Sequence, residues 1–512
     1  MLACVIAVAA GVRLFQLAGP SLWMDEIWTV ELSTGRGSPH LDLPVNAIQN
    51  TQPPLTTLQN APAAWHIWTR VASATHPPLY FLLLRFWEDF FGQSAFALRL
   101  LSVLLSLAAI LVFHDLCRLL HGPRVAVLAA ALMALSLSQI DAAQDTRSYA
   151  MLILAGLLAA NVLVRIEKFQ VNRQRLAGLF FALFFTAITH YFCIGLLIGL
   201  FLYALLRLRS RDRLIAIGTF LAAGIFTTIV WGPFFLAQSR AMPKEWPNFL
   251  TESAPNFVQL AIFHVIGLPA QFFIGTAAAG HLGSAAIVLI AIIAVLIPTI
   301  RLIWRSDLLL WVLWFFCTVG LVAAADIARH ASFLTYLRYT ILASPAVFVM
   351  LAAIEFPRRA IIRDALPLAA IVILLILNIQ RLSDGLTAHE DWRLLATQTN
   401  AAAGPHDLLI FYGDDPWIPP GMFYMGFAFY APDSHRPWLL MTHPPDAALF
   451  RELLHYHDVY LIGFNPVINS ARYLPDFFPE HYLKTTAGTV CHLVRPELVE
   501  PTTATTAPSR PH

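Results

Sequence analysis

Residues 214–236 read LIAIGTFLAAGIFTTIVWGPFFL, a stretch without a single charged side chain. A helix needs roughly 20 mostly apolar residues to cross a bilayer, and this stretch supplies them. Runs of the same kind recur from the N-terminus to about Gln380. We therefore predict a polytopic α-helical membrane protein with about eleven transmembrane helices. These spans are expected near residues 1–18, 96–120, 125–141, 149–166, 176–189, 191–207, 214–236, 283–303, 308–326, 339–356 and 365–380.

The composition agrees with a membrane protein and argues against other classes. Of the 512 residues, 58% are hydrophobic and only 12% are charged, which is too apolar for ordinary globular cores alone. The net charge of +2 gives no reason to expect a nucleic-acid partner. Four of the five cysteines lie inside apolar runs, so no pair is placed for a structural disulfide.

Basic residues are concentrated in the short loops between the predicted spans. If the N-terminus is cytoplasmic, these loops all lie on the cytoplasmic side, which is the positive-inside pattern. The residues are Arg124, Lys168, Arg173, Arg175, Arg207, Arg209, Arg211, Arg213, Arg301, Arg305, Arg358, Arg359 and Arg363. The opposite face then receives segments 19–95, 142–148, 237–282 and 327–338, and everything after Gln380. We expect function on that face because the cytoplasmic loops are too short to build a site.

The change in composition near residue 380 predicts three regions. Residues 1–380 form a transmembrane catalytic domain, in which the outer loop 19–95 carries helices lying in the membrane interface. Residues 381–500 form a small extracytoplasmic α/β domain, with helices at 391–403 and 446–456 and strands at 408–412 and 459–464. Residues 501–512, rich in Thr, Pro and Ala, are expected to be disordered.

Two adjacent carboxylates, Asp25 and Glu26, follow the first span directly, beside Trp23 and Trp28. In one interpretation the tryptophans anchor the helix end in the interface and the acids are solvated. In the other, a carboxylate held against low-dielectric surroundings serves as the base for an acceptor hydroxyl.

A third acid, Asp145, lies in the sequence Gln-Asp-Thr-Arg-Ser-Tyr at 144–149, where the fourth span begins. Asp145 and Tyr149 fall on one helical face. Asp145 and Arg147 could form a local ion pair, and Arg147 could be a snorkelling anchor. Polar residues at a membrane boundary are nevertheless costly and commonly mark a functional site.

Other polar and aromatic residues are predicted at the same depth on the same face. His76 opens an interfacial helix with Pro77 and Pro78, His190 and Tyr191 lie between two spans, and Arg338 and Tyr339 begin the tenth. Each is weak evidence alone, but together they indicate one site. Arg donors at this depth would suit a lipid phosphate, and a carboxylate would suit an acceptor hydroxyl. We expect Asp25 and Asp145 to meet there.

In order and spacing, these motifs resemble the GT-C superfamily of polyprenyl-phosphate-sugar-dependent glycosyltransferases. That superfamily includes the protein O-mannosyltransferases and the aminoarabinose transferases of lipid A, and the resemblance is strongest to bacterial members of the RgtA/B/C/D-like type. The matching motifs are Ser-Leu-Trp-Met-Asp-Glu at 21–26, His-Pro-Pro-Leu-Tyr at 76–80, Gln-Asp-Thr-Arg-Ser-Tyr-Ala at 144–150, Thr-His-Tyr at 189–191, Leu-Arg-Tyr at 337–339 and Asp-Trp-Arg at 391–393.

The resemblance implies a role for each polar residue of these motifs. Asp25 would be the catalytic base, and Glu26 would position the acceptor or support the base. Asp145 would shape the site, or hold a divalent metal ion together with Asp25 if the protein uses one. Arg147 and Arg338 would bind the lipid phosphate. Substrate-binding roles are also expected for His76, Tyr149, His190, Tyr191 and Tyr339.

The resemblance also implies partners and a location. The donor would be a polyprenyl-phosphate-linked sugar, and the acceptor an envelope glycan, a lipid or a protein. The chain would lie in the bacterial inner membrane, with the site and the C-terminal domain outside the cytoplasm, and it would invert the anomeric carbon in one displacement. Two alternatives remain, a transporter or flippase for lipid-linked glycan and a noncatalytic membrane assembly protein. A transporter usually has ionisable residues in mid-span, and they are scarce here.

Overall fold

The structure is a computed structural model of the chain, and its residues fall into two compact units. One unit comprises Met1–Pro20 and Pro62–Thr387, here called the helical unit. The other comprises Ser21–Ala61 and Ala388–His512, here called the α/β unit. The structure describes residues 1–70, 76–241, 267–275, 282–301, 306–329, 331, 333–354, 364–386, 390–413, 419–443, 445–462, 483–487 and 490–494.

Some of the predictions made from the sequence concern residues outside this described set. The disordered tail at 501–512, most of the outer segment 237–282, and Arg305, Arg358, Arg359 and Arg363 lie outside the described residues.

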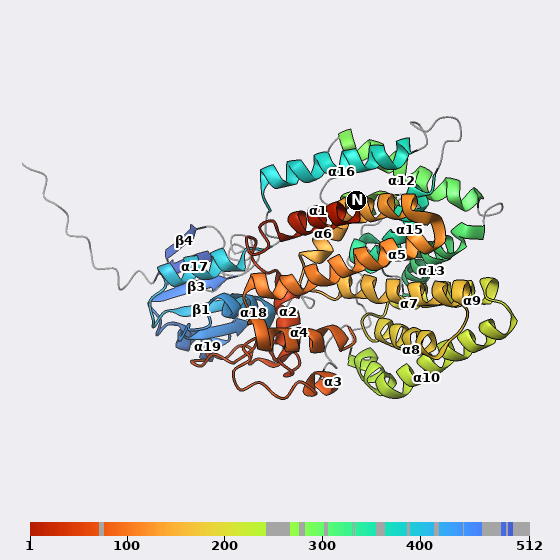
Figure 1. The fold of residues 1–512 in the computed structure, drawn as a ribbon. Coiled ribbons are helices and arrows are strands. Elements are labelled where there is room, and N and C mark those ends of the chain that lie inside the picture. Colours follow the sequence, from red (N-terminus) through yellow and green to blue (C-terminus); the bar gives the residue numbers. More distant parts are fainter. Residues whose placement is uncertain are drawn as a thin grey trace, which may run out of the picture. The chain divides into compact units, whose positions relative to one another are not determined.

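The helical unit is built from long apolar helices packed side by side (Figure 1). Its helices are α1 (Leu2–Leu14), α3 (His66–Arg70), α4 (Leu79–Phe91), α5 (Ala95–Leu135), α6 (Leu137–Ala143), α7 (Tyr149–Phe169), α8 (Arg173–Ala187), α9 (Cys193–Arg207), α10 (Ser210–Ala241), α12 (Leu282–Arg301), α13 (Leu309–Arg329), α14 (Leu337–Thr340), α15 (Ser344–Ala352) and α16 (Ala365–Asp384), with 3-10 turns η3 (Ser306–Leu308), η4 (Phe333–Thr335) and η5 (Ile341–Ala343).

Five helices of the described chain are long and apolar enough to cross a membrane. They cover Ala95–Leu135, Tyr149–Phe169, Arg211–Arg240, Leu309–Arg329 and Ala365–Asp384, and shorter apolar helices cover Leu2–Leu14, Cys193–Arg207 and Leu337–Ala352. The predicted class, a helical membrane protein, is therefore confirmed, whereas the count of about eleven spans stays a prediction.

Helix α5 contains a break that explains its length. The backbone of Gly122 is not helical, with φ 82° and ψ 176°, and Pro123 follows it. A residue without a Cβ atom adopts positive φ at little cost. Proline has no backbone N–H, so it cannot donate the hydrogen bond that a continuous helix needs. Two helical pieces therefore meet here, one on each side of the gap expected between spans 96–120 and 125–141.

Arg13 is a buried polar side chain whose partners lie on a neighbouring helix. The guanidinium of Arg13, fully buried, donates to Ser106 Oγ at 3.0 Å and to the carbonyl oxygen of Ala134 at 2.7 Å. These acceptors offset part of the cost of burying a charge.

Close helix contact also depends on small residues, since a Cβ atom at Gly195 would lie 2.5 Å from the carbonyl oxygen of Cys317. This allows α9 and α13 to pack backbone to backbone.

The α/β unit combines a five-stranded sheet with short helices. It contains α2 (Met24–Ser33), η1 (Pro39–Asp42), α17 (Trp392–Ala402), β1 (Leu408–Tyr412), α18 (Pro420–Tyr430), β2 (Trp438–Met441), α19 (Ala447–Leu453), β3 (Asp458–Ile462), β4 (Leu483–Ala487) and β5 (Val490–Val494). The strand order is β2-β1-β3-β5-β4. Strand β1 is parallel to β2 and β3, whereas β5 is antiparallel to both β3 and β4.

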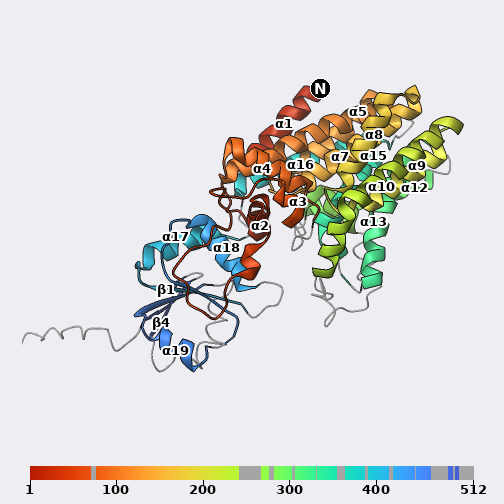
Figure 2. The same cartoon turned by 90° about the horizontal axis from the view of Figure 1, so that it is seen from below.

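Both faces of this sheet are covered, because every residue of β1 is buried. Successive side chains of a strand point to opposite faces. Leu408, Ile410 and Tyr412 share a core with Leu449 and Leu453 of α19. On the other face, the ring of Phe411 packs against the rings of Tyr424 and Phe427 of α18. Figure 2 shows the resulting layers, with α17 and α18 on one side of the strands and α19 on the other.

The segment 21–61 is part of this α/β unit. The backbone N–H of Asn46 donates to the carbonyl oxygen of Leu440 at 2.6 Å, and that of Gln49 to Trp438 at 2.8 Å. The turn η1 lies directly on α18, since a Cβ atom at Gly421 would come within 2.0 Å of the carbonyl oxygen of His40. Glycine at 421 is thus required by the contact. The sequence placed this segment in an outer loop of the membrane domain.

A buried Glu–His pair joins α2 to η1. The Nδ1 atom of His40 lies 2.5 Å from Oε2 of Glu31, and both side chains are fully buried. The backbone N–H of His40 also donates to Oε1 of Glu31 at 3.1 Å. Burial raises the pKa of Glu31, while His40 opposes that rise. The folded protein therefore binds the Glu31 proton more tightly than the unfolded chain does, and stability falls as pH rises through the folded pKa.

We predict that His40→Leu lowers the free energy of unfolding by about 3–5 kcal/mol near neutral pH, because it leaves Glu31 buried without its partner. The loss should be smaller at acid pH, where Glu31 is protonated. Denaturant unfolding across this pH range, followed by tryptophan fluorescence, measures both effects. His406→Leu, at an exposed position of the same unit, is the control. A loss independent of pH would contradict the assigned role of Glu31.

Candidate functional site

The start of α4 is tied to the turn between α8 and α9. The N–H of Leu79, just after Pro77 and Pro78, donates to the carbonyl oxygen of Ile188 at 3.3 Å. Proline needs no amide partner at a helix start, so the two prolines leave few donors to satisfy there. This bond brings the segment that begins at His76 beside the turn that carries His190.

Helix α10 fixes the same two segments from another side. The Nε2 atom of Gln238 donates to the carbonyl oxygen of His76 at 3.2 Å, and its carbonyl oxygen accepts from the hydroxyl of Tyr191. The indole N–H of Trp231 donates to the same hydroxyl at 3.1 Å. Tyr191 is therefore part of this hydrogen-bond network, together with Gln238 and Trp231, which the sequence did not single out.

The rings of His76 and His190 meet edge to face, with centroids 4.5 Å apart. The ring of Tyr149, at the start of α7, lies 5.7 Å from that of His190. The backbone N–H of Phe192 donates to Nδ1 of His190 at 3.2 Å, so a neutral His190 carries its proton on Nε2. This Nε2 atom is buried and has no hydrogen-bond partner within the described residues.

Two guanidinium groups act on this histidine pair. Burial, and then the positive charges of Arg147 and Arg338, lower the pKa of His190 to about 3. Burial also lowers the pKa of His76 well below its usual range, and His190, Arg147 and Arg338 lower it further. Both histidines lie between helices and are neutral near pH 7. The cluster therefore combines permanent positive charge with neutral imidazole donors and acceptors.

Aromatic rings surround the arginine of the tenth predicted span. The guanidinium carbon of Arg338 lies 5.3 Å from the ring centroids of both Tyr336 and Tyr339, within the range of a cation–π contact. The ring of Tyr339 lies 5.0 Å from that of Phe192, which links the segment to the α8–α9 turn. An acid of α13, Asp326, helps to hold this segment in place. Its carboxylate accepts from the N–H groups of Phe333 at 2.6 Å and Leu334 at 2.9 Å.

The segment before α7 is fixed by Gln144. The Nε2 atom of Gln144 donates to the carbonyl oxygens of Arg13 at 3.0 Å and Phe15 at 3.1 Å, at the end of α1. Arg381 donates to its Oε1 atom at 3.1 Å. Asp145 is half-buried, and its carbonyl oxygen accepts the N–H of Arg147 at 2.8 Å. This tight turn leads directly into α7, which begins at Tyr149.

Asp25 and Glu26 lie in the first turn of α2, in the α/β unit. Glu26 is fully buried, and its Oε2 atom accepts the N–H of Trp23 at 3.2 Å. The N–H of Met24 donates to Oε2 of Glu390 at 2.8 Å. Two carboxylates thus satisfy amides that a helix start leaves open. Asp25 is half-buried.

The helical unit therefore brings together His76, Arg147, Tyr149, His190, Tyr191, Arg338 and Tyr339, all expected at one site from their sequence positions. Asp25 and Glu26 belong to the other unit, and the expected meeting of Asp25 with Asp145 stays a prediction. Among the described residues, no three His, Cys, Asp or Glu side chains are grouped to hold a metal ion. A metal ion held by Asp25 and Asp145 stays a prediction, and the chemistry proposed below uses no metal.

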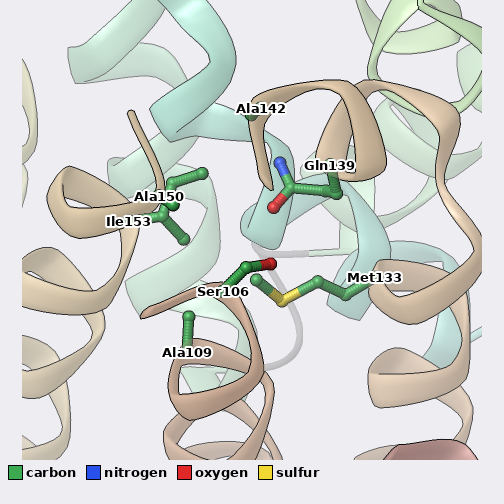
Figure 3. A pocket seen from close by; sticks show the side chains of 7 residues that line it. All are labelled: Ser106, Ala109, Met133, Gln139, Ala142, Ala150 and Ile153. Carbon is green, nitrogen blue, oxygen red and sulfur yellow. The ribbon is translucent and has the colours of Figure 1, made fainter. Parts of the chain in front are cut away.

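A small pocket of the helical unit lies elsewhere. It is enclosed by α5, α6 and α7, and Ser106, Met133 and Gln139 line it (Figure 3). None of the predicted site residues lines it. Ser106 is the hydroxyl that accepts from Arg13, and the amide of Gln139 donates to Ser344 Oγ at 2.9 Å. The pocket is a gap within the internal polar network of the helices.

Residues 75–234 match the family model described as dolichyl-phosphate-mannose-protein mannosyltransferase. This range includes His76, Asp145, Arg147, Tyr149 and His190. No curated protein matches the chain in sequence.

Solved structures resemble the chain at low sequence identity. The oligosaccharyltransferase of Archaeoglobus fulgidus, solved with Zn and sulfate, is 13% identical with a TM-score of 0.50, and the match covers 96% of this chain and 73% of that one. ArnT from Cupriavidus metallidurans, bound to undecaprenyl phosphate, is 14% identical with a TM-score of 0.42, covering 96% of this chain and 97% of that one. The family match and the first likeness confirm the predicted resemblance to the GT-C superfamily, together with its fold.

We predict that Asp326→Ala frees the segment that carries Arg338. The N–H groups of Phe333 and Leu334 lose their acceptor, which costs about 1–3 kcal/mol locally. Hydrogen–deuterium exchange of the full-length protein should therefore become faster at these two amides. Asp384→Ala, at an exposed position at the end of α16, should leave them unchanged. Unaltered protection in Asp326→Ala would show that the carboxylate does not hold the segment.

Proposed function

We propose that this protein is a membrane glycosyltransferase that moves a sugar from a polyprenyl-phosphate carrier to an acceptor hydroxyl. One observation carries the proposal. Five polar or aromatic side chains from four separate segments, His76, Arg147, Tyr149, His190 and Arg338, form one cluster in a helical membrane unit, in which Arg338 is half-buried and the other four are buried. Four of the five lie in the range that matches the family described as dolichyl-phosphate-mannose-protein mannosyltransferase.

The chemistry of the cluster suits a lipid-linked phosphate. Arginine donates several hydrogen bonds in a plane and keeps its charge at any physiological pH, so Arg147 and Arg338 would bind phosphate oxygens. The buried Nε2–H of His190 offers a further donor. The rings of Tyr149, Phe192 and Tyr339 provide an apolar surface for the isoprenoid chain next to the phosphate.

In the proposed reaction, the bond between the sugar's anomeric carbon and the phosphate oxygen breaks as the acceptor oxygen attacks from the opposite side. Asp25 takes the proton of the acceptor hydroxyl. The electron pair of the broken bond leaves with the polyprenyl phosphate, whose growing negative charge Arg147 and Arg338 stabilise. One displacement inverts the anomeric carbon, and no second carboxylate has to act as a nucleophile.

Glu26 and Asp145 would have supporting roles in this scheme. Glu26 is buried and bonded to the start of α2, so we assign it to holding Asp25 in position. Asp145 would shape the turn that presents Arg147. The sugar in this proposal is a hexose or a pentose. The acceptor is an envelope glycan, lipid or protein on the extracytoplasmic face of a bacterial inner membrane.

We predict that Asp25→Asn lowers sugar transfer about 10²–10⁴-fold, the usual contribution of a general base, without loss of folding. The measurement is mass spectrometry of envelope glycans, lipids and proteins from a deletion strain complemented with each variant. The residue missing in the deletion strain identifies sugar and acceptor together. Asp42→Asn, at an exposed position of the same unit, should restore it fully. Full restoration by Asp25→Asn would refute the role of Asp25.

We predict that Arg147→Gln and Arg338→Gln each weaken binding of a polyprenyl monophosphate to the purified protein. A hydrogen bond to a charged group is worth about 1.5–3 kcal/mol, which corresponds to a roughly 10- to 150-fold higher Kd. Arg329→Gln, at an exposed position of α13, is the matched control. If all three variants bind alike, the phosphate is held elsewhere, and a flippase or an assembly protein becomes the better account.

A further inference from the structure

The helical unit has a second polar region, at the end opposite the histidine pair. Helix α8 begins at Arg173 and ends at Ala187, three residues before His190, and α9 returns from Cys193 to Arg207. A helix of this length spans about 22 Å. The turn from α7 to α8 and the turn from α9 to α10 therefore lie together at the far end (Figure 1).

An ion pair joins these two turns directly. The Nη2 atom of Arg207, at the end of α9, lies 2.9 Å from Oε1 of Glu167, near the end of α7. The hydroxyl of Tyr203 donates to the other oxygen of Glu167. Glu167 is thus already paired, and its charge is not available to nearby cations.

The two turns carry a surplus of positive charge. Residues 165–175 and 207–213 contain eight arginines or lysines and two acids. Five of the cations are exposed, and we call them the basic surface: Lys168, Arg173, Arg209, Arg211 and Arg213. Within the described residues, no ion pair joins any of these five to an acid. The neighbouring Asp115 is paired with Arg165 at 2.5 Å and with Arg118 at 3.1 Å.

The backbone under the basic surface is held firmly. Asn172 caps α8 by accepting the N–H of Arg175 at 2.8 Å. The guanidinium of Arg175 donates to the carbonyl oxygens of Phe169 and Gln170, both at 2.6 Å, and lies over the ring of Phe169. A turn fixed in this way presents its cations without further ordering, which lowers the entropy cost of binding.

Large apolar side chains lie next to these cations and are exposed. Leu206 is 65% exposed, Leu214 is 72% exposed and Phe169 is 52% exposed. Leu206 and Leu214 lie on either side of the arginines at 209, 211 and 213 in the chain. Apolar side chains beside cations are the pattern of a segment at the boundary between acyl chains and headgroups. A soluble anionic partner would leave these side chains in water.

We propose that the basic surface binds the headgroups of anionic phospholipids, with Phe169, Leu206 and Leu214 in contact with their acyl chains. The starts of α8 and α10 lie in the same turns, and the partial positive charge of a helix N-terminus adds to the attraction. The site is separate from the proposed catalytic cluster, and it would anchor this end of the helices to one kind of lipid.

Binding of phosphatidylglycerol and phosphatidylcholine with identical acyl chains to the full-length protein in detergent micelles tests this proposal. Native mass spectrometry measures the apparent affinity for each lipid. We expect phosphatidylglycerol to bind more tightly, and its affinity to fall as salt is added. In Arg211→Gln/Arg213→Gln, its affinity should fall at least fivefold, since one cation near an anionic membrane surface contributes about that factor.

Arg70→Gln/Arg240→Gln is the matched control, because it removes two exposed arginines away from the basic surface, one of them at the other end of α10. This variant should bind phosphatidylglycerol as the unmodified protein does. Equal affinity for the two lipids would overturn the proposal. So would an unchanged affinity in Arg211→Gln/Arg213→Gln, or an equal loss in the control variant. Thermal unfolding of each variant in micelles establishes that an affinity change is not a folding defect.

Discussion

A bilayer offers no hydrogen-bond partners, and this constraint determines where the polar residues of the helical unit can lie. Backbone groups are satisfied inside helices, and polar side chains gather where helices end or where they bond to one another. Arg13 illustrates the second case, with its guanidinium donating to Ser106 Oγ and to backbone carbonyls of α5. His76 and His190 illustrate the first, since each lies between helices, and Arg338 lies in the four-residue helix α14. The candidate site is therefore found where three helix connections meet, and its apolar surroundings make the histidines neutral.

The unsatisfied amides at a helix start likewise determine contacts within the α/β unit. The first amides of α2 are satisfied by Glu26 of the same helix and by Glu390, more than 350 positions away. Trp392 donates to the same Glu390 oxygen at 2.7 Å, and the N–H of Leu22 donates to the hydroxyl of Tyr430 at 2.6 Å. These bonds join residues 21–26 to the segment 390–430. The proposed base, Asp25, therefore lies on a helix whose position is set by the C-terminal part of the chain.

The sequence was informative where the physics is local. An uncharged run must become a helix in a bilayer, so the span expected at 149–166 corresponds to α7 at Tyr149–Phe169. His76, Arg147 and His190 lie at the ends of predicted spans. They could be assigned to one site from the sequence because span ends on one face of the membrane lie at the same depth. Gln238 and Glu390 were missed, since each bonds to a backbone group of a distant segment. Asp326 was missed although the amides it bonds to, those of Phe333 and Leu334, lie only seven and eight positions away. The packing of residues 21–61 on the C-terminal sheet likewise depends on bonds across some 390 positions, such as that from Asn46 to Leu440.

The neutral histidine pair has one more consequence for the helical unit. Arginine keeps its proton well above pH 10, and burial lowers the pKa of both His76 and His190, so both rings are uncharged near neutral pH. Near neutral pH, the charge that a ligand meets at this pair therefore comes from Arg147 and Arg338. Acidification of the surrounding medium would change the ionisation of a phosphate ligand but not that of its binding groups. Any change in phosphate binding under moderate acidity would then originate in the ligand.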